Sequence, residues 1–204
     1  MARNHRERRL IKDVCYTREE IQDILRNLVF NATTVLAQHN VSYFLESGTL
    51  LGSFREQGLI KHDVDGDLGI DVAGYEYLRH NKVEVPPEYI FGVFNSTANP
   101  RQGGDIQLPI RLIHIPSALY VDVFVFLDWD GKDGEPLVGP LASVCFLGCV
   151  GCRSVPGGKE LRMPRDWVYP LVDCPFEGRT MKCPNQSDKY LKYMCGPSYM
   201  KSDK

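Results

Sequence analysis

The sequence has no long apolar run. Nothing in its 204 residues approaches the ~20 consecutive apolar side chains that a membrane-spanning helix needs. It also has no signal-peptide core at its start, no internal repeat and no low-complexity tract. We therefore expect no membrane segment within this chain. Charge of one sign is not in excess, because 24 Lys and Arg face 26 Asp and Glu for a net charge of −2. This balance gives no electrostatic reason to expect nucleic acid or an anionic membrane as the main partner.

Cysteine is scarce in the first two thirds of the chain, where only Cys15 occurs, and six of the seven cysteines lie in the last third. Four of the eight Asn residues stand in N-x-[ST] sequons, whereas 16 Ser and Thr in the chain would give fewer than about one by chance. Both features favour an oxidising compartment. We expect a lumenal, Golgi-like location within the secretory pathway, as part of a longer anchored protein, with a cytoplasmic location as the alternative. The sequons begin at Asn31, Asn40, Asn95 and Asn185.

The C-terminal cysteines have two interpretations. The spacing from Cys145 to Cys152 is as close as in zinc sites, but it is not the spacing of a standard zinc ribbon. Six cysteines allow 15 disulfide pairings. We favour disulfides over structural Zn²⁺ or free thiols. The six are Cys145, Cys149, Cys152, Cys174, Cys183 and Cys195.

Length and composition indicate one catalytic domain. Hydrophobic residues make up 43% and charged residues 25%, which are ordinary values for a globular protein. A chain of this length forms one domain with a real core, whereas two full domains would be cramped. We expect a basic N-terminal tail over residues 1–16 and a single domain over 17–204.

Helix and strand signals alternate along the domain. Residues Thr17 to Glu20 form a capping box, and apolar side chains then recur from Ile21 to Leu36 at the spacing of one helix face. Residues 140–185 look irregular and rich in Cys, Pro and Gly. The expected fold class is α/β (α+β), with a mixed sheet flanked by helices. Strands are expected at 41–45, 68–72, 89–94, 106–115 and 120–127, and further helices at 49–54, 75–79 and 188–194.

Asp63, Asp65 and Asp67 occupy alternate positions just before an apolar strand. In an extended segment alternate side chains point the same way, so three like charges would converge and repel unless a cation lies among them. A hard cation such as Mg²⁺ or Mn²⁺ takes oxygen ligands of this kind. A Ca²⁺-binding EF-hand loop is excluded, because Leu68 stands where its glycine should be and Gly74 where its final Glu should be. A solvated acidic turn remains the simpler alternative.

Asp122 lies in the middle of the strongest strand of the sequence, residues 120–127, where a charge needs a partner. It either pairs with an arginine or caps a turn, or it joins Asp65 and Asp67 over a shared metal ion. The second interpretation requires the two strands that carry these carboxylates to be neighbours.

The segment from Gly48 to Ser53 supplies small residues and backbone N–H groups near a helix start, which suits phosphate oxygens. Its candidate phosphate-binding residues are Gly48, Thr49, Gly52 and Ser53. A Gly-Ser step before Asp-x-Asp, with a later strand Asp, is the general layout of nucleotidyltransferase-like folds.

The same segments carry a family resemblance. The chain resembles the LicD/fukutin family over about residues 35 to 204, and the block from the Gly-Thr-Leu-Leu-Gly run to Asp67 is its most specific part. The matching segments are Tyr43–Arg55, Gly58–Ile60, Asp63–Ile70, Tyr120–Phe124, Met163–Val172 and Pro175–Gly178, with shorter matches at Pro184–Asn185, Tyr190–Leu191 and Gly196–Pro197.

This resemblance implies a phosphotransferase with a nucleotidyltransferase-like fold. Such an enzyme moves a phospho-alcohol, for example ribitol 5-phosphate or phosphocholine, from a CDP-alcohol donor to a hydroxyl of a glycan or glycoprotein and releases CMP. It implies dependence on Mg²⁺ or Mn²⁺, with Asp65 and Asp67 as metal ligands and Asp122 as a further ligand or the general base. Asp63 would assist metal or donor binding, and Arg55 would meet the donor phosphate.

Three positions depart from the family pattern. Lys61 and His62 stand where Pro-Trp is common, and Ser47 replaces a second glycine. His62 either contacts phosphate or is an ordinary surface histidine. Two other functions remain open: a nucleotidyltransferase that uses an NTP and releases diphosphate, and a non-catalytic glycan-binding relative. The last is disfavoured because all the carboxylates are present.

Overall fold

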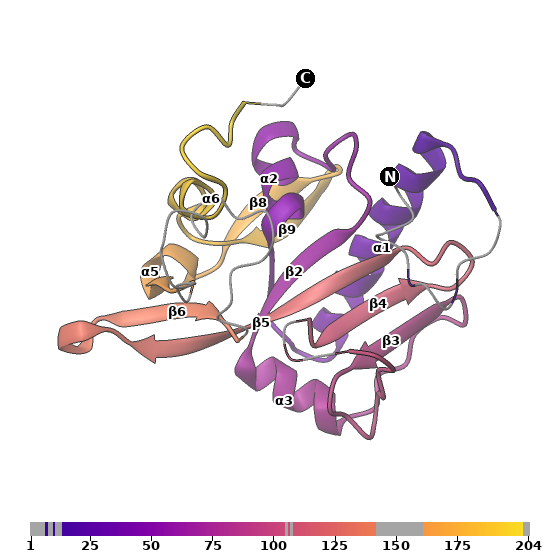
Figure 1. The fold of residues 1–204 in the computed structure, drawn as a ribbon, viewed down its shortest axis with the longest axis horizontal. Helices are drawn as coiled ribbons and strands as arrows, with labels where there is room; N and C mark the ends of the chain where they lie inside the picture. The colour runs from indigo at the N-terminus through magenta and orange to yellow at the C-terminus, as the bar shows by residue number, and fades with distance from the viewer. Residues whose placement is uncertain are drawn as a thin grey trace.

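The computed structural model describes residues 7, 10, 14–104, 106, 108–141 and 161–201 (Figure 1). Cys145, Cys149 and Cys152 therefore lie outside the described residues. Helix α1 (Arg18–Gln38) confirms the predicted capping box: the Thr17 hydroxyl accepts from the Glu20 N–H, and the Glu20 carboxylate accepts from the Thr17 N–H. None of the helices in the described ranges is long and apolar enough to cross a membrane.

A seven-stranded mixed sheet forms the centre of the fold, and it confirms the predicted α/β class. Its main path runs in the order β1-β2-β5-β4-β3, and β5 continues into a hairpin with β6, to which β7 is added. The β2–β5 pair is parallel, whereas the other named pairs are antiparallel. The strands are β1 (Tyr43–Leu45), β2 (Gly66–Asp71), β3 (Tyr89–Val93), β4 (Ile110–His114), β5 (Tyr120–Asp130), β6 (Pro136–Pro140) and β7 (Met163–Pro164).

The expected strands are present with shifted ends. The strand expected over 106–115 begins only at Ile110, directly after Pro109, which has no N–H for the ladder. In contrast, β5 runs past Leu127 to Asp130 and turns into β6 through the 3-10 helix Lys132–Gly134. That helix contains an Asp-Gly pair, which is typical of turns.

The two faces of the sheet are covered by different parts of the chain. Helix α1 packs on one face, where a Cβ on Gly66 would lie 2.9 Å from side-chain carbons of both Val29 and Val121. Side chains alternate along a strand, so Asp67, Gly69 and Asp71 point to the opposite face. The remaining helices are α2 (Ser47–Glu56), α3 (Val72–His80), α5 (Arg165–Val168) and α6 (Ser187–Cys195).

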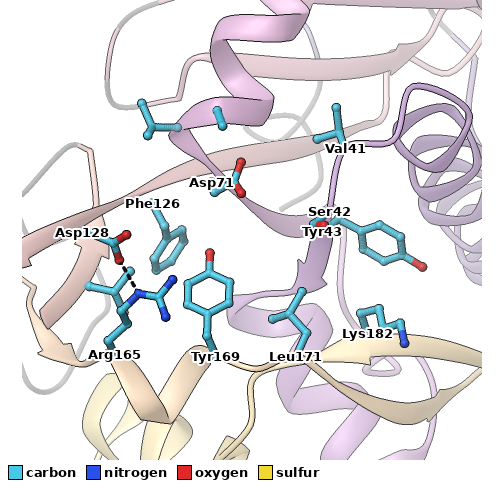
Figure 2. A pocket seen from close by; sticks show the side chains of 13 residues that line it. Val41, Ser42, Tyr43, Asp71, Phe126, Asp128, Arg165, Tyr169, Leu171 and Lys182 are labelled. Carbon is cyan, nitrogen blue, oxygen red and sulfur yellow. Dashed lines mark hydrogen bonds and ion pairs between the residues drawn. The ribbon is translucent and has the colours of Figure 1, made fainter. Parts of the chain in front are cut away.

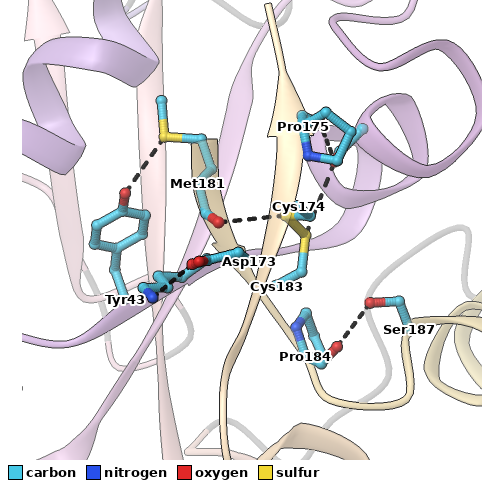
Figure 3. The surroundings of a disulfide bond; sticks show 10 residues. Tyr43, Asp173, Cys174, Pro175, Met181, Cys183, Pro184 and Ser187 are labelled. Carbon is cyan, nitrogen blue, oxygen red and sulfur yellow. Dashed lines mark hydrogen bonds and ion pairs between the residues drawn. A yellow bond between two sulfur atoms is a disulfide. The ribbon is translucent and has the colours of Figure 1, made fainter. Parts of the chain in front are cut away.

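The C-terminal part is more regular than its composition indicates. A separate hairpin, β8 (Val172–Phe176) with β9 (Arg179–Cys183), lies within the range expected to be irregular. A disulfide joins Cys174 to Cys183 (Figure 3). The preference for disulfides is thus confirmed for two of the six C-terminal cysteines. Periodicity missed the hairpin because its strands are short and flank a tight Glu-Gly turn, with positive φ at both turn residues.

Candidate active site

The parallel pairing of β2 with β5 brings the two acidic segments together. In the register of the two strands Asp67 stands directly beside Asp122. Both side chains therefore leave the same face of the sheet. The predicted adjacency of these strands is confirmed.

Asp63 and Asp65 reach the site from the loop before β2, because the strand begins only at Gly66. Asp63 nevertheless approaches Asp67 closely. A Cβ placed on Gly48 would lie 2.9 Å from Oδ2 of Asp63 and 3.7 Å from Oδ2 of Asp67. The absence of a side chain at Gly48 thus lets both carboxylates approach the backbone at the start of α2.

Helix α2 begins beside these carboxylates. The buried Thr49 hydroxyl accepts a hydrogen bond from the Asp67 N–H at 2.8 Å, and the Glu46 N–H donates to the Asp67 carbonyl at 3.2 Å. These two bonds hold the first turn of α2 against the start of β2. The N-terminal end of a helix carries a partial positive charge, which favours carboxylates and phosphates nearby.

Glu46 is a site residue that the sequence analysis missed. It is 2% exposed, and its Oε1 accepts a hydrogen bond from the Tyr190 hydroxyl at 2.6 Å. Its Oε2 has no hydrogen-bond partner among the described residues. Burial raises the pKa of Glu46, against the opposing effect of the hydroxyl groups of Ser47 and Tyr190. A Glu placed between an apolar strand and a helix start was the available signal.

Asp67 is the electrostatic centre of the cluster. Burial raises its pKa well above the usual range, and the charges of Asp65, Glu46, Asp122 and Asp63 raise it further, in that order. The negative charges around this carboxyl repel one another. A divalent cation bound among them would supply the missing positive charge. No three His, Cys, Asp or Glu of the described ranges are placed to hold a metal ion as they stand. The cluster fits a hard cation in charge and donor type, and its side chains would have to move inward to bind it.

Asp122 has an arginine partner, which was one of the two interpretations of its sequence position. Arg111 on β4 donates from Nε to Oδ1 at 2.6 Å and from Nη2 to Oδ2 at 2.8 Å. Its guanidinium carbon also lies 3.6 Å from the centre of the Tyr120 ring. Burial raises the pKa of Asp122, and Arg111 opposes that rise. Both interpretations are therefore met in part: Asp122 lies next to Asp67 on the same face of the sheet, and it is also paired with Arg111.

The predicted phosphate-binding residues do not all reach this site. A Cβ on Gly52 would collide with the Gly58 carbonyl oxygen, so this glycine is needed where the following loop passes close to α2. The buried Ser53 hydroxyl donates to the Pro175 carbonyl of β8 at 2.7 Å. Both residues are therefore engaged in packing, whereas Gly48 and Thr49 adjoin the carboxylates.

The two basic residues predicted to contact phosphate, Arg55 and His62, have no hydrogen bond to the acidic cluster within the described part of the chain. Arg55 pairs with its neighbour Glu56 at 2.8 Å, and its side chain is 12% exposed. His62 is exposed in the turn before Asp63. Their predicted contact with donor phosphate stays a prediction.

Residues 40–134 match the family described as LicD/FKTN/FKRP, nucleotidyltransferase domain. This segment is similar to a LicD-family domain, and it makes up slightly less than half of the chain. The matched segment contains the whole acidic cluster, from Glu46 to Asp122.

Alignments with two longer relatives extend the similarity beyond this segment. The chain is 27% identical over 182 residues to the ribitol 5-phosphate transferase FKRP of Homo sapiens and 26% identical to that of Mus musculus. Each alignment covers 87% of this chain and 32% of the relative, so the chain spans about a third of their length. An uncharacterized protein of Rickettsia prowazekii (strain Madrid E) is 46% identical over 46 residues, which are 22% of this chain and 17% of that protein. The family resemblance is confirmed.

Proposed function

We propose that this LicD-family domain is a metal-dependent phosphotransferase. It moves a phospho-alcohol, such as ribitol 5-phosphate or phosphocholine, from a CDP-alcohol donor to a hydroxyl of a glycan or glycoprotein. The observation that carries the proposal is the crowding of four carboxylates around Asp67 beside the start of α2. Similarity to a protein named a ribitol 5-phosphate transferase supports the class of reaction.

In this mechanism Asp65 and Asp67, assisted by Asp63, would hold Mg²⁺ or Mn²⁺, and the bound ion would neutralise charge on the diphosphate oxygens of the donor. The first turn of α2 lies beside these carboxylates, and the N–H groups of a helix start suit the donor phosphates. The acceptor hydroxyl oxygen forms a bond to the phosphorus of the alcohol phosphate as the diphosphate P–O bond breaks and CMP leaves.

Asp122 accepts the proton of the acceptor hydroxyl. Arg111 opposes the rise in the pKa of Asp122 that burial causes, and it fixes the orientation of the carboxylate through two hydrogen bonds. Each carboxylate oxygen retains a second lone pair, so the pairing leaves room for that proton.

A second candidate function is nucleotidyl transfer from an NTP, favoured by the words nucleotidyltransferase domain in the family description. One assay separates the candidates: the protein is incubated with Mn²⁺ and a panel of CDP-ribitol, CDP-choline and the four NTPs, with and without glycan acceptor. We expect CMP from a CDP-alcohol. Release of diphosphate would instead establish the second candidate, and neither product would indicate a non-catalytic glycan-binding relative.

We also propose a lumenal, Golgi-like location as part of a longer, membrane-anchored protein. The Cys174–Cys183 disulfide and the four sequons support an oxidising compartment. Structural Zn²⁺ at the remaining cysteines stays a proposal that metal analysis of the purified protein would test. The expected result is no zinc bound in proportion to protein.

A further inference from the structure

A second recess lies at the opposite end of the β2–β5 pair from the acidic cluster. It is a cavity of about 620 Å³ that is bordered by Asp71 at the end of β2 and by Phe126 and Asp128 on β5 (Figure 2). Tyr169 and Arg165, from the segment that begins with α5, close its other side. Asp71 follows Asp67 by four residues, which is roughly 13 Å along a strand.

The recess and the acidic cluster share one face of the sheet but are separate. Asp67 and Asp71 point the same way, and their register partners Asp122 and Phe126 do likewise. Between them the Phe44 ring lies directly over Gly69, where any Cβ would collide with it. The recess therefore needs a function other than metal binding at the cluster.

The two cationic side chains that line the recess, Arg165 and Lys182, are already paired. Arg165 Nε lies 2.8 Å from Asp128 Oδ1, and Lys182 Nζ lies 2.6 Å from Asp173 Oδ1. Both cations are thus neutralised by carboxylates of the protein. An anionic ligand such as a phosphate would have to displace these pairs, so the charge pattern favours a neutral ligand.

Asp71 and Tyr169 each present to the recess a polar atom that has no hydrogen-bond partner among the described residues. Asp71 Oδ1 accepts from the Gly74 N–H and caps α3, but the other oxygen, Oδ2, has no hydrogen bond within the described part of the chain. The Tyr169 hydroxyl likewise has none there, and in Figure 2 it points toward Asp71. Burial raises the pKa of Tyr169 to about 12, so its hydroxyl remains a donor at neutral pH. The pair offers one donor and one acceptor.

Apolar side chains complete the lining, among them Phe126, Leu171 and Val72. A cavity with apolar walls and a few convergent polar groups is typical of a small-ligand site. A neutral ligand that presents both C–H faces and hydroxyl groups matches this lining, and a sugar residue has that chemistry.

We propose that this recess binds a neutral sugar residue of a glycan, held by the Tyr169 hydroxyl and Asp71 Oδ2. The binding itself is independent of the reaction at the acidic cluster. Its assignment to the acceptor glycan, at a sugar distant from the hydroxyl that reacts, rests on the proposed function.

The test uses ligand-observed saturation-transfer NMR on the intact chain. The probes are neutral oligosaccharides of glucose, galactose, xylose, N-acetylglucosamine or N-acetylgalactosamine, with inorganic phosphate and CMP as anionic probes. Ala73→Phe fills the recess from an exposed position on α3, and Ala73→Ser is the matched control that leaves it open. Tyr169→Phe removes only the hydroxyl.

At least one neutral oligosaccharide should bind the wild-type chain and Ala73→Ser. Ala73→Phe should weaken that binding at least tenfold, and Tyr169→Phe by about five- to tenfold. Asp67→Asn should leave sugar binding unchanged. If the wild-type chain binds the sugar but releases no CMP, the proposed function is refuted and the sugar site is not. The proposal is overturned if no neutral oligosaccharide binds, if Ala73→Phe binds as wild type does, or if phosphate occupies the recess instead.

Discussion

At the scale of single residues, Asp67 is the carboxylate that is most destabilised by the charges around it. Its neighbours are carboxylates, and the guanidinium of Arg111 is committed to Asp122 rather than to Asp67. Ordinary packing would place an apolar or neutral side chain at such a position. A site that is destabilised by its own charges in this way is arranged for something positive to bind.

The first prediction concerns Asp67→Asn, which keeps the shape and removes the charge. CMP release should fall by orders of magnitude, while the melting temperature at pH 7 without metal should stay the same or rise. Asp130→Asn, at the exposed far end of β5, is the matched control and should change neither. Activity near that of wild type in Asp67→Asn would remove this residue from the mechanism.

The pH dependence of stability follows from the same residue. Because the folded pKa of Asp67 lies above its unfolded value of about 3.9, the folded chain retains this proton to a higher pH than the unfolded chain. The contribution of Asp67 to stability is therefore present at low pH and is lost as pH rises through the folded pKa. Melting curves without metal should show this loss in the wild type and not in Asp67→Asn. Added Mg²⁺ or Mn²⁺ should raise the melting temperature of the wild type more than that of the variant.

Thr49 allows a test of how α2 is held to β2. Thr49→Val removes the hydroxyl that accepts from the Asp67 N–H and leaves that donor unpaired, so unfolding should become about 1–3 kcal/mol easier. Thr49→Ser keeps the hydroxyl and is the control. Denaturant titration measures both. Equal stability of the Val and Ser variants would show that the hydrogen bond contributes little.

At the scale of elements, the β8–β9 hairpin and α6 brace the acidic site from outside. Glu177, between the two strands, accepts from the Leu59 N–H at 2.8 Å and from Arg26 Nε at 2.6 Å. Ser53 is bound to β8, and Tyr190 of α6 is bound to Glu46. The C-terminal elements thus fix the loop that leaves α2 and the residue that precedes it.

The disulfide of the hairpin gives a prediction at this scale. It closes a loop of about ten residues, for which chain entropy predicts a contribution of about 2–3 kcal/mol to stability. The double variant Cys174→Ser with Cys183→Ser should unfold at a correspondingly lower denaturant concentration. Cys15→Ser, at an exposed thiol, is the control. If the reduced wild type unfolds at the same denaturant concentration as the double variant, the disulfide accounts for the difference in stability.

At the scale of the whole molecule, the acidic cluster and the sugar-binding recess lie on one face of the sheet, opposite α1. The β2–β5 pair sets their separation, because both sites take residues from these two strands. The Phe44 ring between the two sites is 1% exposed, so a glycan bound in the recess could reach the cluster only around the part of the chain that covers this ring. The rigid parallel pair therefore sets the geometry between binding and transfer.

The compartment of the whole molecule is tested by its sequons. Asn40 and Asn95 are exposed in turns, whereas Asn31 donates to the Asn27 carbonyl from within α1 and Asn185 donates to the Asp166 carbonyl. In protein secreted from eukaryotic cells, Asn40→Gln and Asn95→Gln should each remove the mass of one glycan. Asn31→Gln and Asn185→Gln should change nothing in mass spectra. Absence of any glycan would count against the lumenal proposal.

Much of the local structure was predictable from the residues alone. The capping box before α1, the β-branched run of β5 and the helix near Tyr190 follow from short-range periodicity and side-chain preference. The adjacency of Asp67 and Asp122 was also predicted, because a buried strand carboxylate demands a reason. In each case the deciding interactions lie within a few residues of sequence, or the cost of a buried charge is large enough to be read without coordinates.

Only the tertiary structure decided which side chains are hydrogen-bond and ion-pair partners. Arg111 is one of many arginines until the register of β4 against β5 places it on Asp122. The sequence predicts Ser53 as a phosphate ligand, but in the fold its hydroxyl donates to β8. Glu46 was not singled out from the sequence, and in the fold its carboxylate accepts a hydrogen bond from Tyr190. The sequence by itself determined which segments become helix and strand and where acid collects. The three-dimensional fold determined which charges meet, because electrostatic and hydrogen-bond energies depend on distances between residues far apart in the chain.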